Sequence, residues 1–267
     1  NSSVVIHKDK KLKDVLTEIE TNTDELHLGI KTINNNLTTL TQDIKLNLSK
    51  LDNKFSKINL VQFAELNNID TTLWDNALIQ AIDYCILNKK TLYIPNGDYL
   101  FNGNIEIRKE GTQALIIEGE NKTNTILRFK NGGIKFDNLE DTIDYQKRIT
   151  FVELKNLTIR KQTIDKIGTG LDIKHFGYFK LDNIKIRDFE KGLSLYNGSE
   201  FDMLTSEVLG NRIGIYLENP ITVGKQSDLA NINIYSTRIY SNDNNIIANN
   251  CREINFIGCA LMNYNGA

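Results

Sequence analysis

The stretch 170–218, GLDIKHFGYFKLDNIKIRDFEKGLSLYNGSEFDMLTSEVLGNRIGIYLE, repeats itself every 22 residues. Three glycines mark the repeat, each preceding an apolar-x-apolar triplet: Gly170, Gly192 and Gly214. After an insertion of about nine residues around 222–229 the period resumes, so that Ile232 maps onto Ile254. A fixed period of this length is typical of stacked supersecondary units, each of which contacts only its neighbours.

Within each unit apolar and polar residues alternate, which predicts strands. Three short strands per coil of about 22 residues, separated by turns rich in Asn, Asp and Gly, predict a parallel β-helix. Two coils supply near-identical inward-facing sets: Val152, Leu154, Leu157 and Ile159, then Phe179, Leu181, Ile184 and Ile186. Asn156 and Asn183 fall at the bends between strands, where Asn tolerates left-handed backbone geometry.

The outward positions test this stacking independently, because the register was chosen without reference to charge. Opposite charges fall one above the other in four pairs: Lys180 with Asp202, Lys185 with Glu207, Glu190 with Arg212, and Glu207 with Arg238. Such cross-strand pairs are favourable. They also assign these side chains to the scaffold in preference to a site.

The segment 10–58 has a different pattern. Apolar residues recur at alternating steps of three and four, with Thr23 filling one gap: Leu12, Leu16, Ile19, Leu26, Ile30, Ile33, Leu37, Leu40 and Ile44. The stripe continues, after a stutter, as Leu48, Leu51, Phe55 and Ile58. This heptad seam predicts a coiled coil. Mixed Leu and Ile at both seam positions favours a parallel trimer over a dimer, and a long helix packed on its own chain is the alternative.

Between the two lies a junction with helix and strand signals. An amphipathic helix is predicted over 73–86, with Thr71 or Thr72 as its N-cap. The segment 91–101 then predicts strand, turn, strand. We expect the helix to cover the apolar end of the β-stack.

The stretch 74–101 resembles the entry segment of the pectate-lyase-like right-handed β-helix superfamily. The matching residues are Ala77, Ala81-Ile82-Asp83 and Pro95-Asn96-Gly97-Asp98-Tyr99. The family's Gly-Asp-Gly and Asp-Asp before the helix are missing, and Asn68-Ile69-Asp70-Thr71-Thr72 stands there instead. The resemblance covers roughly 60–267 and implies a mainly β, right-handed parallel β-helix. A stalk leading into such a domain resembles trimeric bacteriophage tailspikes and tail appendages.

We therefore predict three parts: a coiled-coil stalk over 1–58, a junction with a capping helix over 59–105, and a parallel β-helix over 106–267. We expect the β-helix to be continued by a further domain or a longer polypeptide, because its last coil has no capping element.

Charge, hydropathy and cysteine content limit the classes of partner that we expect for this chain. The net charge is −2, and no basic run interleaves with aromatics, so nucleic acid is not expected as a partner. No apolar stretch approaches 18 residues and no signal peptide is evident, which argues against a membrane span. The three cysteines form no disulfide framework, and Cys85 and Cys259 are predicted in the core, consistent with assembly in a host cytoplasm.

No catalytic signature is evident. Glycosidases need two carboxylates close together, yet no acid recurs at the 22-residue step within 170–218. Of the signatures of the pectin hydrolases, only an Asn-Thr-Asp occurs, in the stalk at 22–24. His7, His27 and His175 have no second ligand at metal spacing, so neither a metal nor another cofactor is predicted.

A sugar-binding surface is the remaining candidate. The outward column of Asp172, Ser194 and Tyr216, with Tyr196 nearby, combines an acid, a hydroxyl and aromatic rings on one face. Aromatic faces and hydrogen-bond acceptors suit carbohydrate rings, although a Tyr on a strand also packs against its cross-strand neighbours.

The sequence thus predicts a homotrimeric component of a phage tail that adheres to a bacterial surface polysaccharide, a capsule or a teichoic acid. Its N-terminal stalk would bind other tail or baseplate proteins. The alternative is a polysaccharide depolymerase with carboxylates on the β-helix or between subunits. A free bacterial polysaccharide lyase fits the stalk poorly.

Overall fold

The structure, a computed structural model, describes residues 2–52, 56–108, 114–138, 148–149, 151–219 and 229–262, and in the first helix the side chains of 11–42. The chain divides into two compact units, Asn1–Phe55 and Ser56–Ala267. Each unit is described by itself.

The first unit is one helix, α1 (Ser2–Asp52), of 51 residues, which confirms the predicted helix. The seam residues between 12 and 40 are exposed by half or more, Ile30 by 50 % and Ile33 by 66 %. The side chains of Ile44, Leu48 and Leu51, and all of Phe55, lie outside the described part of the chain. The described stripe therefore has no apolar cover within its own unit.

The continuation of the stripe to Ile58 is wrong. Ile58 lies in β1 (Lys57–Asn59), pairs with Leu92 of a neighbouring strand, and is only 7 % exposed. Apolar spacing alone cannot distinguish a last helical turn from a short buried strand, because both present an isolated Ile at a suitable interval.

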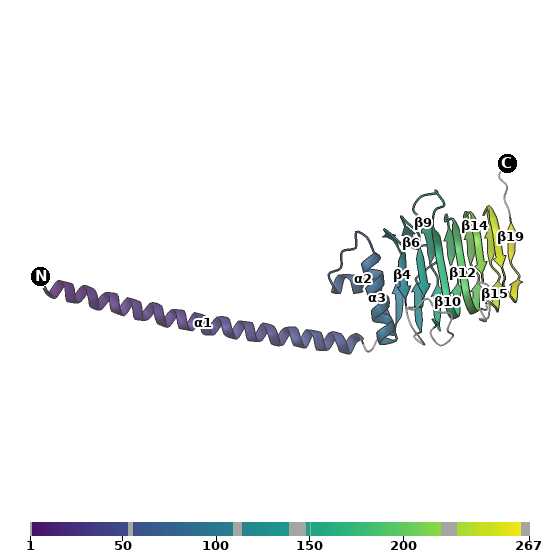
Figure 1. Cartoon of the computed structure of the whole chain (residues 1–267). Coiled ribbons are helices and arrows are strands. Elements are labelled where there is room, and N and C mark those ends of the chain that lie inside the picture. Colours follow the sequence, from purple (N-terminus) through teal and green to yellow (C-terminus); the bar gives the residue numbers. More distant parts are fainter. Residues whose placement is uncertain are drawn as a thin grey trace. The chain divides into compact units, whose positions relative to one another are not determined.

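The junction contains two helices, α2 (Leu60–Leu66) and α3 (Asp75–Asn88). The predicted apolar face of α3 is buried, from Ala77 to Ile86. The predicted N-cap is wrong: Trp74 occupies that position without a side-chain cap, while Thr72 donates to Asp70 in a local turn. Figure 1 shows α2 and α3 at the end of the β-stack where the chain enters it, beside β4 (Ile105–Arg108). The short helix α2 was not predicted.

Parallel strands form three ladders. The first ladder joins β4, β7 (Ile134–Asp137), the first half of β10 (Thr169–Asp182), the first half of β12 (Lys191–Leu204), β14 (Ile213–Glu218) and β17 (Asn244–Asn249). The second joins β1, β2 (Thr91–Ile94), β5 (Leu115–Gly119), β8 (Val152–Lys155), the second halves of β10 and β12, β15 (Ile232–Tyr235) and β18 (Ile254–Ile257).

The third ladder joins β3 (Gly97–Phe101), β6 (Thr125–Phe129), β9 (Thr158–Lys161), β11 (Lys185–Arg187), β13 (Glu207–Leu209), β16 (Arg238–Tyr240) and β19 (Ala260–Met262). β2 and β3 confirm the predicted strand, turn, strand. Because successive strands of each ladder come from successive passes of the chain, this is a parallel β-helix.

The register predicted from the repeat is confirmed over the stretch that carries it. Leu171 pairs with Leu193 and Phe179 with Phe201. Across the insertion, Met203 pairs with Ile234. The step is not uniform elsewhere, since hydrogen-bonded residues on neighbouring coils are separated by 22, 27 or 31 residues. Longer loops between coils account for the difference.

The core lies between the ladders. Both predicted inward sets, from 152 to 159 and from 179 to 186, are buried to 1 % exposure or less. At the bends, Asn156 and Asn183 adopt φ of 59° and 55°, as predicted, and Asn183 donates to the Asn156 side chain at 2.8 Å. These two bends are therefore joined by a side-chain hydrogen bond.

The charge pairing is confirmed in part. Glu207 contacts Lys185 at 3.4 Å and Arg238 at 2.7 Å, as the register predicts. Lys180 is aligned with Asp202, but its ammonium contacts Glu153 of the preceding coil at 2.9 Å. A long side chain can reach either neighbour, so register alone does not select the partner.

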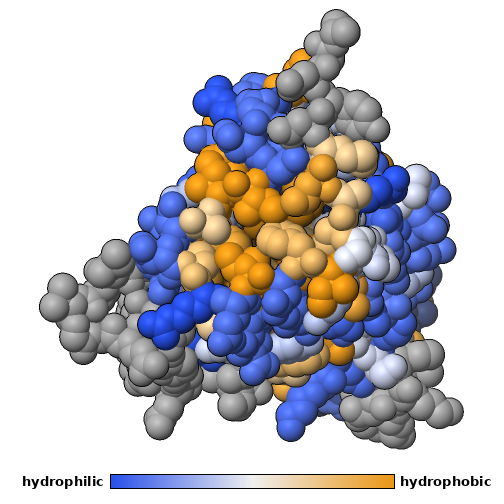
Figure 2. All heavy atoms as spheres, turned by 90° about the vertical axis from the view of Figure 1, so that its right-hand side faces the viewer, coloured by the Kyte–Doolittle hydropathy of each residue, from blue (hydrophilic) through white to orange (hydrophobic). Residues whose placement is uncertain are grey.

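At the β17–β19 end, apolar side chains are exposed (Figure 2). Phe256 and Leu261, aligned with buried Ile234 and Ile239, are 37 % and 50 % exposed. Cys259, predicted in the core, is only partly buried there, whereas Cys85 is fully buried in α3.

Candidate functional site

The four predicted sugar-binding residues share the outer side of the first ladder. Asp172 pairs with Ser194, and Ser194 with Tyr216, so the three lie in one row on neighbouring strands. Tyr196 lies in the adjacent row, between Lys174 and Glu218. The register of the repeat therefore brings all four together.

Cations partly cover this surface. The Lys191 ammonium lies 3.8 Å from the centre of the Tyr216 ring, and the Lys174 ammonium 5.5 Å from that of Tyr196. Lys174 also contacts Asp172 at 3.8 Å, and Ser194 is only 8 % exposed. A sugar stacking on either ring face would compete with a cation–π contact. The surface is less open than the sequence pattern predicts.

Towards the first coils the same two rows become a charged grid. Lys135 contacts Glu106 at 2.8 Å and Asp137 at 3.2 Å, and Arg108 contacts Glu106 at 2.8 Å. Hydrogen bonds from Lys135 and then Arg108 lower the pKa of Glu106. Burial alone would raise the pKa of Asp137, but hydrogen bonds from His175 and Lys135 lower it overall. Both groups are held ionised, unlike the protonated carboxylic acid that a glycosidase requires.

A buried polar cluster, which the sequence analysis missed, occupies the corner between the first and second ladders. His175 Nδ1 lies 2.8 Å from Asp137 Oδ1, and the two residues are 3 % and 1 % exposed. Arg148, 1 % exposed, donates to Asn197 at 2.9 Å and to the Ser199 hydroxyl. Because buried ionised groups are costly without partners, this cluster holds the corner in one arrangement.

One sequence signal marks this corner. His175 and Asn197 are one repeat apart, and both adopt a φ of 49°. The recurrence of a polar residue at the 22-residue step is visible in the sequence, and it could have marked this bend. His175 is a buried histidine whose Nδ1 contacts Asp137. Among the described residues, no group of three or more His, Cys, Asp or Glu side chains could hold a metal ion.

The second ladder carries a further aromatic pair that was not predicted. Phe151 and Tyr178 stack with ring centres 5.5 Å apart, and the Tyr178 hydroxyl donates to Asp202 at 2.9 Å. Burial, together with the Asp202 carboxylate, raises the pKa of Tyr178 to about 12. Tyr178 is therefore a neutral hydrogen-bond donor at neutral pH.

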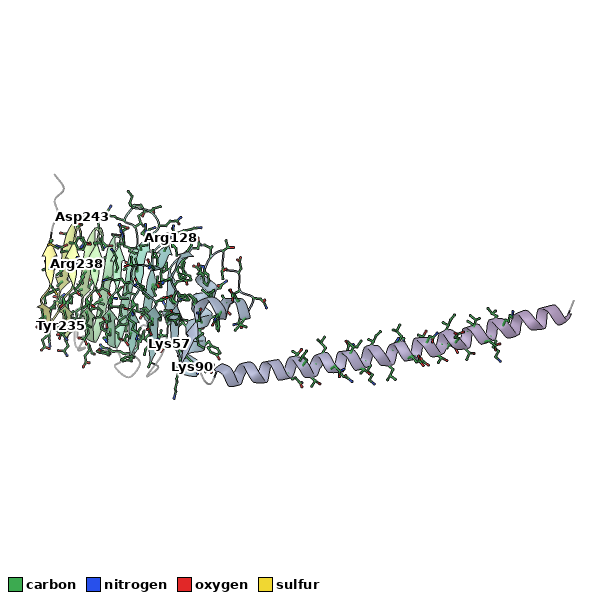
Figure 3. The ribbon with its side chains drawn as sticks, turned by 180° about the vertical axis from the view of Figure 1, so that it is seen from behind. Lys57, Lys90, Arg128, Tyr235, Arg238 and Asp243 are labelled. Atoms are coloured by element: carbon green, nitrogen blue, oxygen red, sulfur yellow. The ribbon has the colours of Figure 1, made fainter. Side chains whose placement is uncertain are left out.

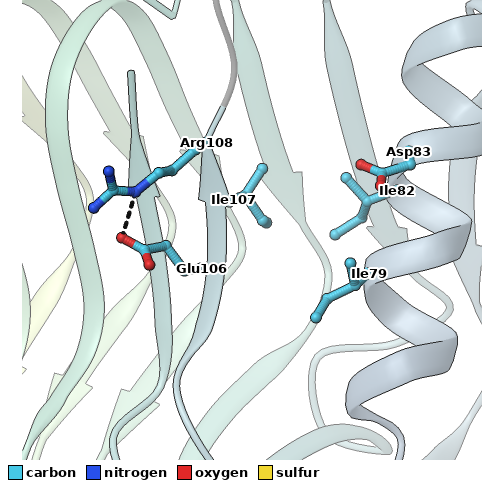
Figure 4. Close-up of a pocket in the computed structure, with 6 residues that line it drawn as sticks. All are labelled: Ile79, Ile82, Asp83, Glu106, Ile107 and Arg108. Atoms are coloured by element: carbon cyan, nitrogen blue, oxygen red, sulfur yellow. Dashed lines mark hydrogen bonds and ion pairs between the residues drawn. The ribbon is translucent and has the colours of Figure 1, made fainter. Parts of the chain in front are cut away.

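A hollow of about 240 Å³ lies between α3 and β4, lined by Ile79, Ile82, Asp83, Glu106, Ile107 and Arg108 (Figure 4). Sites for drug-sized ligands usually measure about 300–1,000 Å³. The hollow is too small for an oligosaccharide, so the outer faces of the ladders are better candidates.

Sequence comparison finds no matching protein family and no matching curated protein. Among solved structures, ORF18 of Geobacillus virus E2 aligns with a TM-score of 0.58 at 15 % identity, covering 81 % of this chain and 44 % of that one. The A-module of the mannuronan C-5 epimerase AlgE4 of Azotobacter vinelandii aligns with a TM-score of 0.35 at 12 % identity, covering 75 % of this chain and 76 % of the module.

The first likeness supports the parallel β-helix fold. The present chain spans less than half of the viral protein, and at this identity the likeness extends to fold alone. No described helix is both long and apolar enough to cross a membrane.

Proposed function

We propose that this chain is a virion component of a bacteriophage, a tailspike or tail appendage that binds a bacterial surface polysaccharide. One observation carries the proposal: a 51-residue helix with an exposed apolar stripe precedes a parallel β-helix in the same chain. The fold likeness to a viral protein supports it. In the finer form of the proposal, the β-helix is right-handed with three strands per coil.

The apolar stripe of α1 is the basis for proposing a trimer. A helix of this length with aliphatic side chains exposed by 50–66 % gains stability by burying them against identical helices. Leu and Ile are mixed at both seam positions, which favours three chains over two. The stalk would also attach the protein to other tail or baseplate proteins.

The chain offers a matched pair of variants. Leu26 is on the seam and Leu28 is off it, yet in the single chain they are 65 % and 67 % exposed. Leu26→Asp should lower the mass of the full-length protein in solution from that of three chains towards one, whereas Leu28→Asp should leave it unchanged. Light scattering after size exclusion measures this mass. A monomeric wild-type protein would contradict the proposed assembly.

A trimer would present three copies of each face along one axis. Such multivalency raises avidity by about 10²–10⁴ without strong individual sites. We place one contact on the outer side of the first ladder, with Asp172, Ser194, Tyr196 and Tyr216 as its residues.

We favour adhesion over cleavage at this face of the first ladder, because Glu106 and Asp137 there are paired with cations that lower the pKa of both carboxyl groups. The experiment incubates the full-length protein with purified bacterial surface polysaccharides and measures both retention and polymer length. Retention without shortening fits adhesion. Shortening that a single Asp→Asn change abolishes would replace adhesion with depolymerisation, and no retention of any polysaccharide would refute the proposal.

A further inference from the structure

Three arginines lie in register on the outer side of the third ladder. Arg128 of β6 pairs with Arg160 of β9, and Arg160 pairs with Arg187 of β11. Neighbouring strands are about 4.8 Å apart, so these residues form a column of like charge, called here the arginine row. Like charges directly opposite one another are unfavourable. The fold therefore maintains an arrangement that needs a compensating anion.

The two outer arginines have such an anion within the chain. Arg128 forms a two-point contact with Asp98, through Nε at 2.8 Å and through Nη2. Arg187 donates through Nε to Asp188 at 2.7 Å. Both are typical guanidinium–carboxylate pairs.

The central arginine differs. Within the described part of the chain the Arg160 side chain makes no hydrogen bond or ion pair, and its buried Nε has no acceptor. A buried donor without an acceptor is uncommon in folded proteins and requires an explanation. The residue is only partly buried overall, so a ligand in solution can reach the row at this point.

The adjacent row on the same ladder adds to the positive charge. There Glu207, 7 % exposed, is surrounded by Lys122 and Lys185, each at 3.4 Å, and by Arg238 at 2.7 Å. One carboxylate thus faces three cations. Figure 3 labels Arg238 of this group and Arg128 of the arginine row. The whole chain has a net charge of −2, so this excess is local to the third ladder.

We propose that the arginine row is a binding site for an acidic glycan, a polysaccharide carrying a carboxylate or phosphate group at regular intervals. Arginine suits both groups because its planar fork donates to two oxygens at once. Arg160 offers the donors for one anionic group of the polymer, and the paired Arg128 and Arg187 stand on either side of it. This inference rests on the proposed polysaccharide binding. It adds that the polysaccharide is acidic and that it contacts a second surface, on the third ladder.

The test measures binding of the full-length protein to immobilised polygalacturonate, poly(glycerol phosphate) and neutral dextran, at low and physiological ionic strength. Arg160→Gln removes the central charge, and Arg160→Lys keeps the charge without the fork. Lys57→Gln is the control for loss of one positive charge elsewhere, because Lys57 is an exposed cation on the second ladder, where it pairs with Glu118 at 2.8 Å (labelled in Figure 3). Thermal melting of each variant verifies folding. Because the Arg160 side chain loses no partner among the described residues, Arg160→Gln should melt at or above the wild-type temperature.

We expect the wild type to bind at least one acidic polymer, more weakly as salt increases. Arg160→Gln should weaken that binding about tenfold or more, Arg160→Lys by less, and Lys57→Gln by under about twofold. The polymer preferred, polygalacturonate or poly(glycerol phosphate), identifies the group as carboxylate or phosphate.

Three results would overturn the inference. If wild type and Arg160→Gln bind an acidic polymer equally, the arginine row is not the binding site. If dextran is retained as well, the proposed polysaccharide binding still stands. Retention of none of the three polymers overturns the inference, and the panel of surface polysaccharides then decides the proposed function separately. Duplex DNA, immobilised as a further polymer in the same assay, is the control for unselective attraction to polyanions, and binding to it as tight as to any glycan would overturn the inference.

Discussion

The glycine column at 170, 192 and 214 allows the most direct test of the stacking. A Cβ added to Gly192 would lie 2.8 Å from the carbonyl oxygen of Gly214, 2.7 Å from Asn211 Nδ2 and 2.9 Å from Val208 Cγ1. Likewise a Cβ on Gly170 would lie 2.8 Å from the carbonyl oxygen of Gly192. Each glycine therefore leaves room for the backbone of the next coil, which is why the repeat keeps this residue.

The cost of Gly192→Ala follows from these neighbours. The Gly214 carbonyl belongs to a paired strand and cannot retreat alone, so the added methyl overpacks the site, at about 1–3 kcal/mol. Asn211 would also be displaced, although it accepts from the Phe189 N–H at 2.9 Å and donates to Leu209 at 3.1 Å. Each weakened hydrogen bond adds about 1 kcal/mol at most. We expect a total loss of roughly 2–4 kcal/mol in the free energy of unfolding.

Urea and thermal unfolding followed by circular dichroism measure this loss. The melting temperature of the β-helix should fall by roughly 4–16 °C. Gly103→Ala is the matched control, because a Cβ there meets nothing within 4 Å, and its stability should change by under about 0.5 kcal/mol. If Gly192→Ala is as stable as Gly103→Ala, the close approach of successive coils at this column is wrong.

Three further predictions concern the core, the charge cluster and the bends. Leu181→Ala should lose about 2–5 kcal/mol in urea unfolding, because Leu181 is fully buried; Leu87→Ala, at an 81 % exposed position, should lose under about 0.5 kcal/mol. Burial opposes ionisation of Glu207, but the Arg238 hydrogen bond and nearby lysines lower its pKa below the ordinary 4.5. The stabilisation by Glu207 is thus complete above pH 4.5 and lost as the pH falls through the lowered pKa. In Glu207→Gln, the free energy of unfolding should therefore lack this decrease when it is measured against pH. Asn183→Ala should cost about 1–2 kcal/mol, and Asn183→Gly less, because Asn183 has a φ of 55°.

Each of these has an outcome that contradicts it. Equal losses for the two leucine variants would place Leu181 outside the core. An acid titration unchanged by Glu207→Gln would mean that this carboxylate contributes nothing through its cations. If the glycine variant at 183 is the less stable one, backbone conformation does not control that bend.

The sequence predicted the stacking well where the repeat is regular. In-register pairing places each residue on its equivalent in the next coil. Leu171 on Leu193 therefore follows directly from a period of 22, and Glu207 on Arg238 follows once the insertion around 222–229 is added to that period. The grouping of Asp172, Ser194 and Tyr216 follows for the same reason. Residue type and spacing carry this information because the pairing is local between neighbouring coils.

Side-chain partners were predicted less well. Lys180 turns to Glu153 where Asp202 was expected, and Lys191 covers the ring of Tyr216. Several partners lie within reach of a flexible ammonium, and only the packed surroundings select one. Arg160, whose side chain has no partner in the described ranges, was missed because Arg128, Arg160 and Arg187 lie in coils with unequal loops, where the 22-residue step does not align them.

The sequence by itself determined the β-helix, its inward-facing residues and the long amphipathic helix, because alternation, a repeat and a heptad are local periodicities that directly set which face of an element is apolar. Only the tertiary structure decided how Asp137 meets His175, that Lys122 also reaches Glu207, and that the Arg160 side chain has no partner among the described residues. Those contacts join segments separated by 38 residues in the first case and as many as 85 in the second. Loop lengths between coils set them, and no local pattern records where a long loop returns the chain.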